Sequence, residues 1–148
     1  GIAKRDKTAI MGGSYGGYLT AHALARRSDL FAAGADMHGV HNWNTAVPTF
    51  TPEYDSLSYP QIGRLAYQSS PLYYLDGWRS PVLLIHGDDD ANVNFRETVT
   101  LQKHLRQRKV ETELLVIPDE VHSFLRFRSW LRAYSAIDDF FERKNGGR

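Results

Sequence analysis

Four short apolar runs are the first regularity in the hydrophobic pattern of the chain. They lie at residues 8–11, 31–35, 82–85 and 114–117. None of them alternates between apolar and polar positions, and continuous runs of this length are typical of strands buried on both faces of a parallel sheet. The pattern therefore predicts four such strands covered by helices.

Helical periodicity occupies most of the intervals between these runs. Residues 16–27 carry spaced apolar positions and end in two arginines, which favours a helix that ends there. A second helix is expected over 94–109 with Asn94 as its N-cap. A third is expected over 127–141, where apolar residues recur at steps of three and four.

The interval from about residue 38 to residue 80 is too long for a plain loop. It is rich in prolines and aromatic residues, and we expect short helices within it at 61–68 and 71–75. The resulting order of strands and helices predicts an α/β fold with a mainly parallel sheet flanked by helices.

Composition excludes several classes of partner and chemistry. The 148 residues carry 18 Lys and Arg against 17 Asp and Glu, a net charge of +1. A nearly neutral chain has no general attraction to nucleic acid or to an anionic membrane, so neither is expected as a partner. The basic stretches 103–109 and 126–132 are interpreted as solvated helix faces, because acidic residues balance them. The absence of cysteine excludes disulfides, thiolate metal sites and a cysteine nucleophile.

Length and termini bear on domain organisation. A chain of 148 residues is expected to form one domain. It begins without Met and runs almost at once into an apolar strand, so we expect it to be cut from something longer. No signal peptide is visible in it, and the localisation stays open between cytoplasm and periplasm.

The most informative motif is a G-x-S-x-G segment between the first predicted strand and the first predicted helix. Gly12 and Gly16 flank Ser14. A sharp strand-to-helix turn at 12–16, a nucleophile elbow, would force Ser14 to a positive φ, project it above the sheet and leave no room for side chains on either side. The backbone N–H of Tyr15, near the helix N-terminus, could donate to an oxyanion. The alternative is a glycine-rich turn without chemistry, but the position between strand and helix favours the nucleophile.

Polar clusters follow the third and fourth predicted strands, at 86–93 and 118–123. The carboxyl ends of parallel strands are where ligands bind in open α/β sheets, and the chain order Ser, acid, His is that of α/β-hydrolases. These residues therefore predict a catalytic triad with His122 as base. Taken alone, they leave the acid open among Asp88, Asp89 and Asp90.

The chain resembles the C-terminal part of the catalytic domain in the prolyl oligopeptidase family of serine peptidases. The resemblance is carried by residues 12–18, by 81–87 followed by Asp90, and by 118–120 followed by His122. It implies that 1–148 is the C-terminal portion of an α/β-hydrolase peptidase domain, with the upstream strands and β-propeller absent.

The resemblance also assigns roles. It makes Ser14 the nucleophile and His122 the base, and it selects Asp90 as acid because the family's acid lies four residues after the His of His-Gly. Asn92 matches a position that binds the substrate backbone in dipeptidyl peptidases, and the alternative for it is an asparagine that stabilises a turn or caps a helix. A second oxyanion donor, typically a Tyr, is implied upstream of this chain.

Two aromatic residues are weaker candidates. Tyr18 is expected to line the substrate pocket or to pack under the elbow. Trp43 is a possible pocket wall, although such a Trp is more often part of the core. The remaining histidines are expected to make structural contacts: His38 and His41 polar contacts in preference to a metal site, and His86 a packed hydrogen bond. His22 and His104 are expected to have no chemical role.

The expected activity is hydrolysis of peptide bonds in oligopeptides through an acyl-enzyme, with no metal or organic cofactor. Two alternatives remain, an esterase of the same fold and an inactive truncated interaction module. Homo-oligomers are expected through the C-terminal helix or an exposed sheet edge.

Overall fold

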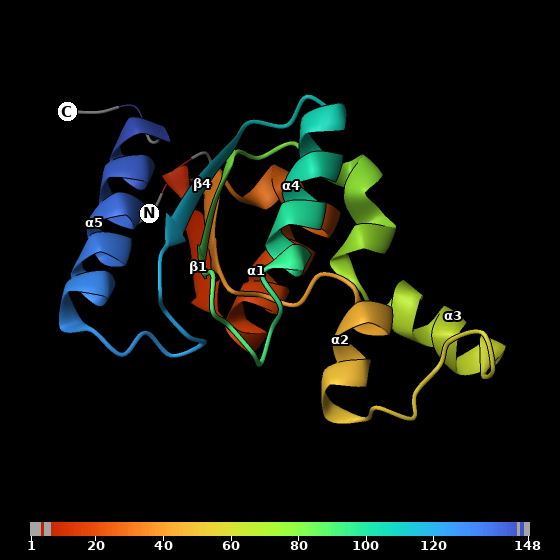
Figure 1. Ribbon diagram of the computed structural model, residues 1–148. Helices are drawn as coiled ribbons and strands as arrows, with labels where there is room; N and C mark the ends of the chain where they lie inside the picture. Colours follow the sequence, from red (N-terminus) through yellow and green to blue (C-terminus); the bar gives the residue numbers. More distant parts are fainter. Residues whose placement is uncertain (1–3, 5–6, 145, 147–148) are drawn as a thin grey trace.

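The sheet of the computed structural model contains four parallel strands, as the apolar runs predicted (Figure 1). The structure describes residues 4, 7–144 and 146. The strands are β1 Ala9–Gly13, β2 Ala33–Met37, β3 Val82–Gly87 and β4 Thr112–Ile117, and they lie side by side in chain order. This order and the flanking helices confirm the predicted α/β class.

Helices cover both faces of this sheet. They are α1 Tyr15–Arg27, α2 Trp43–Phe50, α3 Pro60–Gln68, α4 Arg96–Gln107 and α5 Phe127–Lys144, with short 3₁₀ helices η2 Ser28–Leu30 and η3 Pro71–Gly77. In Figure 1, α5 lies on one side of the sheet and α1 and α4 lie on the other. No helix of the described chain is both long and apolar enough to cross a membrane.

The central strand β3 shows how the apolar pattern builds two cores. All of its residues are buried. Leu84 packs with Leu24 and Leu101 beneath α1 and α4, whereas Leu83 and Ile85 pack in a second cluster with residues of α5. Successive residues of a strand point to opposite faces, so a strand covered on both sides must be continuously apolar.

The helix α2 was not predicted from the sequence. Asn42 caps it by accepting the backbone N–H of Asn44, and the N–H groups of His41 and Asn42 both donate to Glu97 Oε2 at 2.8 Å. Because Glu97 lies on α4, far along the chain, a local pattern could not reveal this cap. α2 and α3 extend away from the sheet (Figure 1).

The start of α4 also differs from the prediction. The helix begins at Arg96, two residues after the expected N-cap. Asn94 nevertheless accepts the backbone N–H of Arg96 at 2.9 Å, so its side chain satisfies one of the unpaired donors at the beginning of the helix.

Candidate active site

The turn between β1 and α1 holds Ser14 in a strained conformation. Its φ is 56° and its ψ is −117°, which confirms the positive φ expected from the elbow motif. A Cβ on Gly12 would lie 2.5 Å from backbone atoms of Gly16, so position 12 requires glycine. A Cβ on Gly16 itself would meet nothing within 4 Å, so the expectation that both flanks are crowded is wrong there.

Ser14, His122 and Asp90 form one chain of hydrogen bonds. His122 Nε2 lies 2.8 Å from Ser14 Oγ, and His122 Nδ1 lies 2.7 Å from Asp90 Oδ2. The acid and the histidine lie on the loops after β3 and β4, at the edge of the sheet where β1 ends. With a proton on Nδ1 directed at the carboxylate, Nε2 is free to accept the serine hydroxyl proton.

The carboxylate of Asp90 is fully buried and held from several directions. Its Oδ1 accepts the backbone N–H groups of Asn92 and Val93 at 2.9 Å, and its Oδ2 lies 3.1 Å from His86 Nε2. Burial raises the pKa of Asp90, but hydrogen bonds from His86, the Val93 N–H and His122 outweigh it and lower the pKa to about 2. The group is therefore a carboxylate at neutral pH.

The neighbouring aspartates are placed differently. Asp88 and Asp89 are exposed. The Asp88 carboxylate accepts the backbone N–H of Asp119 at 2.8 Å. Of the three consecutive aspartates, the one that hydrogen-bonds His122 is Asp90.

His38 contacts both the elbow and the candidate base. It is 5% exposed, its ring centroid lies 4.5 Å from that of His122, and its Nδ1 accepts the Ser14 backbone N–H at 3.0 Å. Burial, and then the neighbouring imidazoles of His122 and His86, lower the pKa of His38 to about 4, so its ring is neutral at neutral pH. The sequence predicted a polar contact but not this partner. The only signal was a histidine directly after the second strand, at the edge where the site forms.

Two other predicted contacts are confirmed. The imidazole of His41 is buried against Asp36, with Nε2 2.7 Å from Oδ2. That of His86 is buried, with Nδ1 2.7 Å from the Thr98 hydroxyl oxygen.

A possible metal-ligand set coincides with this site. His38, Asp90 and His122 offer ligand atoms that all lie within 4.8 Å of one another. Asp90 and His122 already hydrogen-bond each other, and His122 also reaches Ser14. A metal ion would therefore compete with the hydrogen bonds that join Ser14, His122 and Asp90.

The remaining sequence candidates surround the elbow. Tyr15 is the first residue of α1, so its backbone N–H has no partner within the helix. The ring of Tyr18 lies 5.4 Å from that of Trp43, in an edge-to-face contact, and both side chains are half-buried. Asn92 is exposed beside Asp90, and its side chain makes no hydrogen bond to the described residues.

These features together are those of an α/β-hydrolase: a nucleophile elbow after a parallel strand, with acid and histidine on later loops. Residues 1–148 match the Prolyl oligopeptidase family, and the chain belongs to that family.

Curated relatives agree with this assignment. The chain is 31% identical over 160 residues to Dipeptidyl aminopeptidase BIII of Pseudoxanthomonas mexicana, in a match that covers 100% of this chain and 23% of the relative. It is also 31% identical over 159 residues to Dipeptidyl peptidase family member 6 of Caenorhabditis elegans, with 99% and 22% covered. The chain thus spans about a quarter of the length of these relatives.

Solved structures share the fold. An acylaminoacyl peptidase of Pyrococcus horikoshii superposes with a TM-score of 0.86 at 28% identity, over 99% of this chain and 25% of that one. A puromycin-hydrolyzing peptidase of Mycobacterium tuberculosis superposes with a TM-score of 0.87 at 26% identity, over 99% and 24%.

Proposed function

We propose that this chain carries the catalytic residues of a serine peptidase that acts on oligopeptides, and that 1–148 is the C-terminal portion of its hydrolase domain. The observation that carries the proposal is the continuous contact from Ser14 Oγ through His122 to the buried Asp90 carboxylate, at 2.8 and 2.7 Å. Membership of a peptidase family supports the choice of substrate class.

The proposed reaction begins when Ser14 Oγ attacks the carbon of the scissile carbonyl. The hydroxyl proton passes to His122 Nε2, and the carbonyl electron pair moves onto oxygen. The Tyr15 N–H donates to this oxyanion. The imidazolium that forms is stabilised by the ionised Asp90.

The acyl-enzyme forms when the oxyanion collapses and the C–N bond breaks. His122 returns its proton to the departing amine. Water then attacks the ester carbon while His122 takes one of its protons, and the proton returns to Ser14 Oγ as the C–O bond of the ester breaks. The cycle ends with a free carboxylic acid and the original serine.

The substrate contacts belong to the same proposal. The exposed side chain of Asn92, next to the candidate acid, would hydrogen-bond the substrate backbone. The edge-to-face pair of Tyr18 and Trp43 beside the elbow would form an apolar wall for the side chain on the acyl side of the scissile bond.

The test uses the full-length protein that carries this chain. A fluorophosphonate should label the wild type but not Ser14→Ala. A chromogenic peptide should be hydrolysed, with turnover lost in Ser14→Ala by several orders of magnitude. Turnover of short acyl esters without turnover of any peptide would indicate an esterase. Absence of labelling in a folded protein would indicate a non-enzymatic module.

A further inference from the structure

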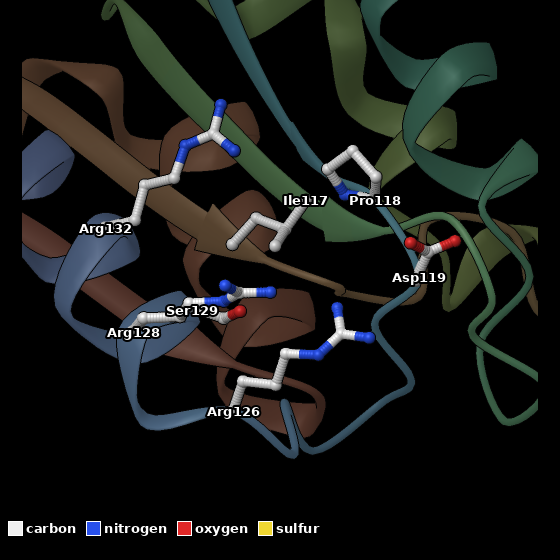
Figure 2. A pocket seen from close by; sticks show the side chains of 7 residues that line it. All are labelled: Ile117, Pro118, Asp119, Arg126, Arg128, Ser129 and Arg132. Carbon is white, nitrogen blue, oxygen red and sulfur yellow. The ribbon is translucent and has the colours of Figure 1, made fainter.

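A concave site whose lining includes none of Ser14, Asp90 and His122 lies between the end of β4 and the first turns of α5 (Figure 2). Its volume is about 390 Å³. Asp119 lines one side, and Arg126, Arg128, Ser129 and Arg132 line the other. Figure 2 shows the three arginine side chains arranged around the same hollow. We call this site the arginine pocket.

The charge of the arginine pocket is not balanced by its own lining. Three arginines face one aspartate, which leaves an excess of two positive charges. Within the part of the chain that the structure describes, the side chains of Arg128 and Arg132 have no hydrogen-bond or ion-pair partner. The Arg126 side chain has one distant contact, with Nη1 4.0 Å from Glu120 Oε1. All three arginines are exposed, as expected of a solvated face, but no acidic side chain among the described residues pairs with Arg128 or Arg132.

The nearby acid Glu120 does not neutralise the pocket. Its buried carboxylate accepts the Ser129 hydroxyl at 2.6 Å and the Leu125 backbone N–H at 2.7 Å. The Ser129 hydroxyl, and then the Leu125 and Arg126 N–H groups, lower the pKa of Glu120 despite its burial. Its oxygens thus stabilise the turn before α5. Counting Glu120 together with the residues that line the pocket still leaves an excess of one positive charge.

We propose that the arginine pocket binds a multiply charged phosphate-type oxyanion, of the size of a diphosphate. A guanidinium presents a planar fork of donors that matches phosphate oxygens, and such charge-assisted pairs are the stronger hydrogen bonds. A single carboxylate could satisfy one fork and would leave the others unpaired. A pocket with several forks and room for more than one phosphate therefore favours a multivalent anion.

A ligand in the arginine pocket would restrain the backbone segment that carries His122. The pocket is lined from both ends of the segment 118–126, which contains His122. An anion bound to Arg126 and Arg128 would add contacts at one end of this segment while it also packs against Pro118 at the other. Bound anion is therefore expected to slow hydrogen exchange of the backbone in 118–126.

Isothermal titration with inorganic pyrophosphate, at constant ionic strength and with the full-length protein, tests the proposal. The pocket variant is Arg128→Gln with Arg132→Gln. The matched control is Arg64→Gln with Arg96→Gln, which removes the same charge from exposed arginines of α3 and α4 that have no side-chain partner in the described chain. We expect saturable binding that is weakened about tenfold or more in the pocket variant and unchanged in the control.

Three outcomes would overturn the proposal: no saturable heat with the wild type, equal weakening in both double variants, or acetate binding as tightly as pyrophosphate. If the pocket variant fails to fold by circular dichroism, Arg128→Lys with Arg132→Lys carries the test. Lysine keeps the charge but lacks the fork, so binding should still weaken. The Ser14→Ala protein should bind pyrophosphate like the wild type, so this result does not depend on the proposed peptidase.

Discussion

At the scale of single residues, Asp88, Asp89 and Asp90 are consecutive carboxylates whose contacts separate their roles. We predict that Asp90→Asn leaves the fold intact and lowers kcat/KM by about 10⁴, because an amide cannot stabilise the imidazolium or hold the required tautomer. Asp88→Asn should change kcat/KM little. Peptide hydrolysis and thermal melting of both variants provide the measurement. Equal losses in the two variants would contradict the assigned roles.

His38 predicts a specific pH dependence of stability. Its folded pKa of about 4 lies below the ordinary value of 6.5, so between these values the unfolded chain binds a proton that the folded chain does not. The free energy of unfolding should therefore fall as the pH is lowered through this window, by at most roughly 3 kcal/mol from this residue.

The control for that prediction is His38→Asn, whose amide oxygen can still accept the Ser14 N–H. Urea unfolding of both proteins at about pH 7 and about pH 4.5 should show a smaller loss of stability in the variant. An identical loss in the two proteins would show that His38 titrates normally in the folded state.

Some residues of the site could be predicted from the sequence and others could not. The elbow, the polar loops after two strands and the family resemblance together pointed to Ser14, Asp90 and His122, and these side chains do lie in contact. The contact of His38 with the elbow could not be predicted, because it depends on how β2 lies against β1. The convergence of arginines from α5 with the end of β4 depends on tertiary packing in the same way.

At the scale of elements, the elbow has no space for a side chain at Gly12 but has space for one at Gly16. Gly12→Ala places a methyl group against the backbone of Gly16, which cannot rotate away, and should destabilise the protein by about 1–3 kcal/mol or more. Gly16→Ala places its methyl group in open space within α1, where alanine is the better helix former, and should be neutral or stabilising by up to about 1 kcal/mol.

Chemical denaturation of the two glycine variants measures this difference. They share the same chemical change within one turn, so general effects of an added methyl group cancel. Equal destabilisation by both would mean that Gly16 is also crowded in solution, and no destabilisation by either would mean that the close approach at Gly12 relaxes.

The elements themselves were largely predictable where local pattern decides them. Each apolar run became a strand, shifted by up to two residues at its start, and the amphipathic stretch from residue 127 became α5. The helix α2 escaped prediction because it contains Pro48 and its cap includes the distant Glu97. Long-range hydrogen bonds of this kind leave no periodic signal.

At the scale of the whole molecule, the described sheet has one flank that its helices leave open. β1 lies at the edge of the sheet and pairs with β2 alone among the described strands. Met11 aligns with Ala35, which packs on the α5 side, yet α5 contacts β2 and β3 and leaves Met11 43% exposed. An apolar strand edge with unpaired backbone groups favours association with another chain.

We therefore predict that the 148-residue chain, produced by itself, self-associates through β1. Met11→Lys should shift it toward monomer, because an edge lysine opposes strand pairing. The competing surface is the exposed face of α5, where Leu131 is 53% and Tyr134 is 49% exposed. Leu131→Lys should leave the association unchanged if the edge is responsible. Light scattering after size-exclusion chromatography distinguishes the two surfaces, and a wild-type chain that is monomeric at all accessible concentrations would contradict the prediction.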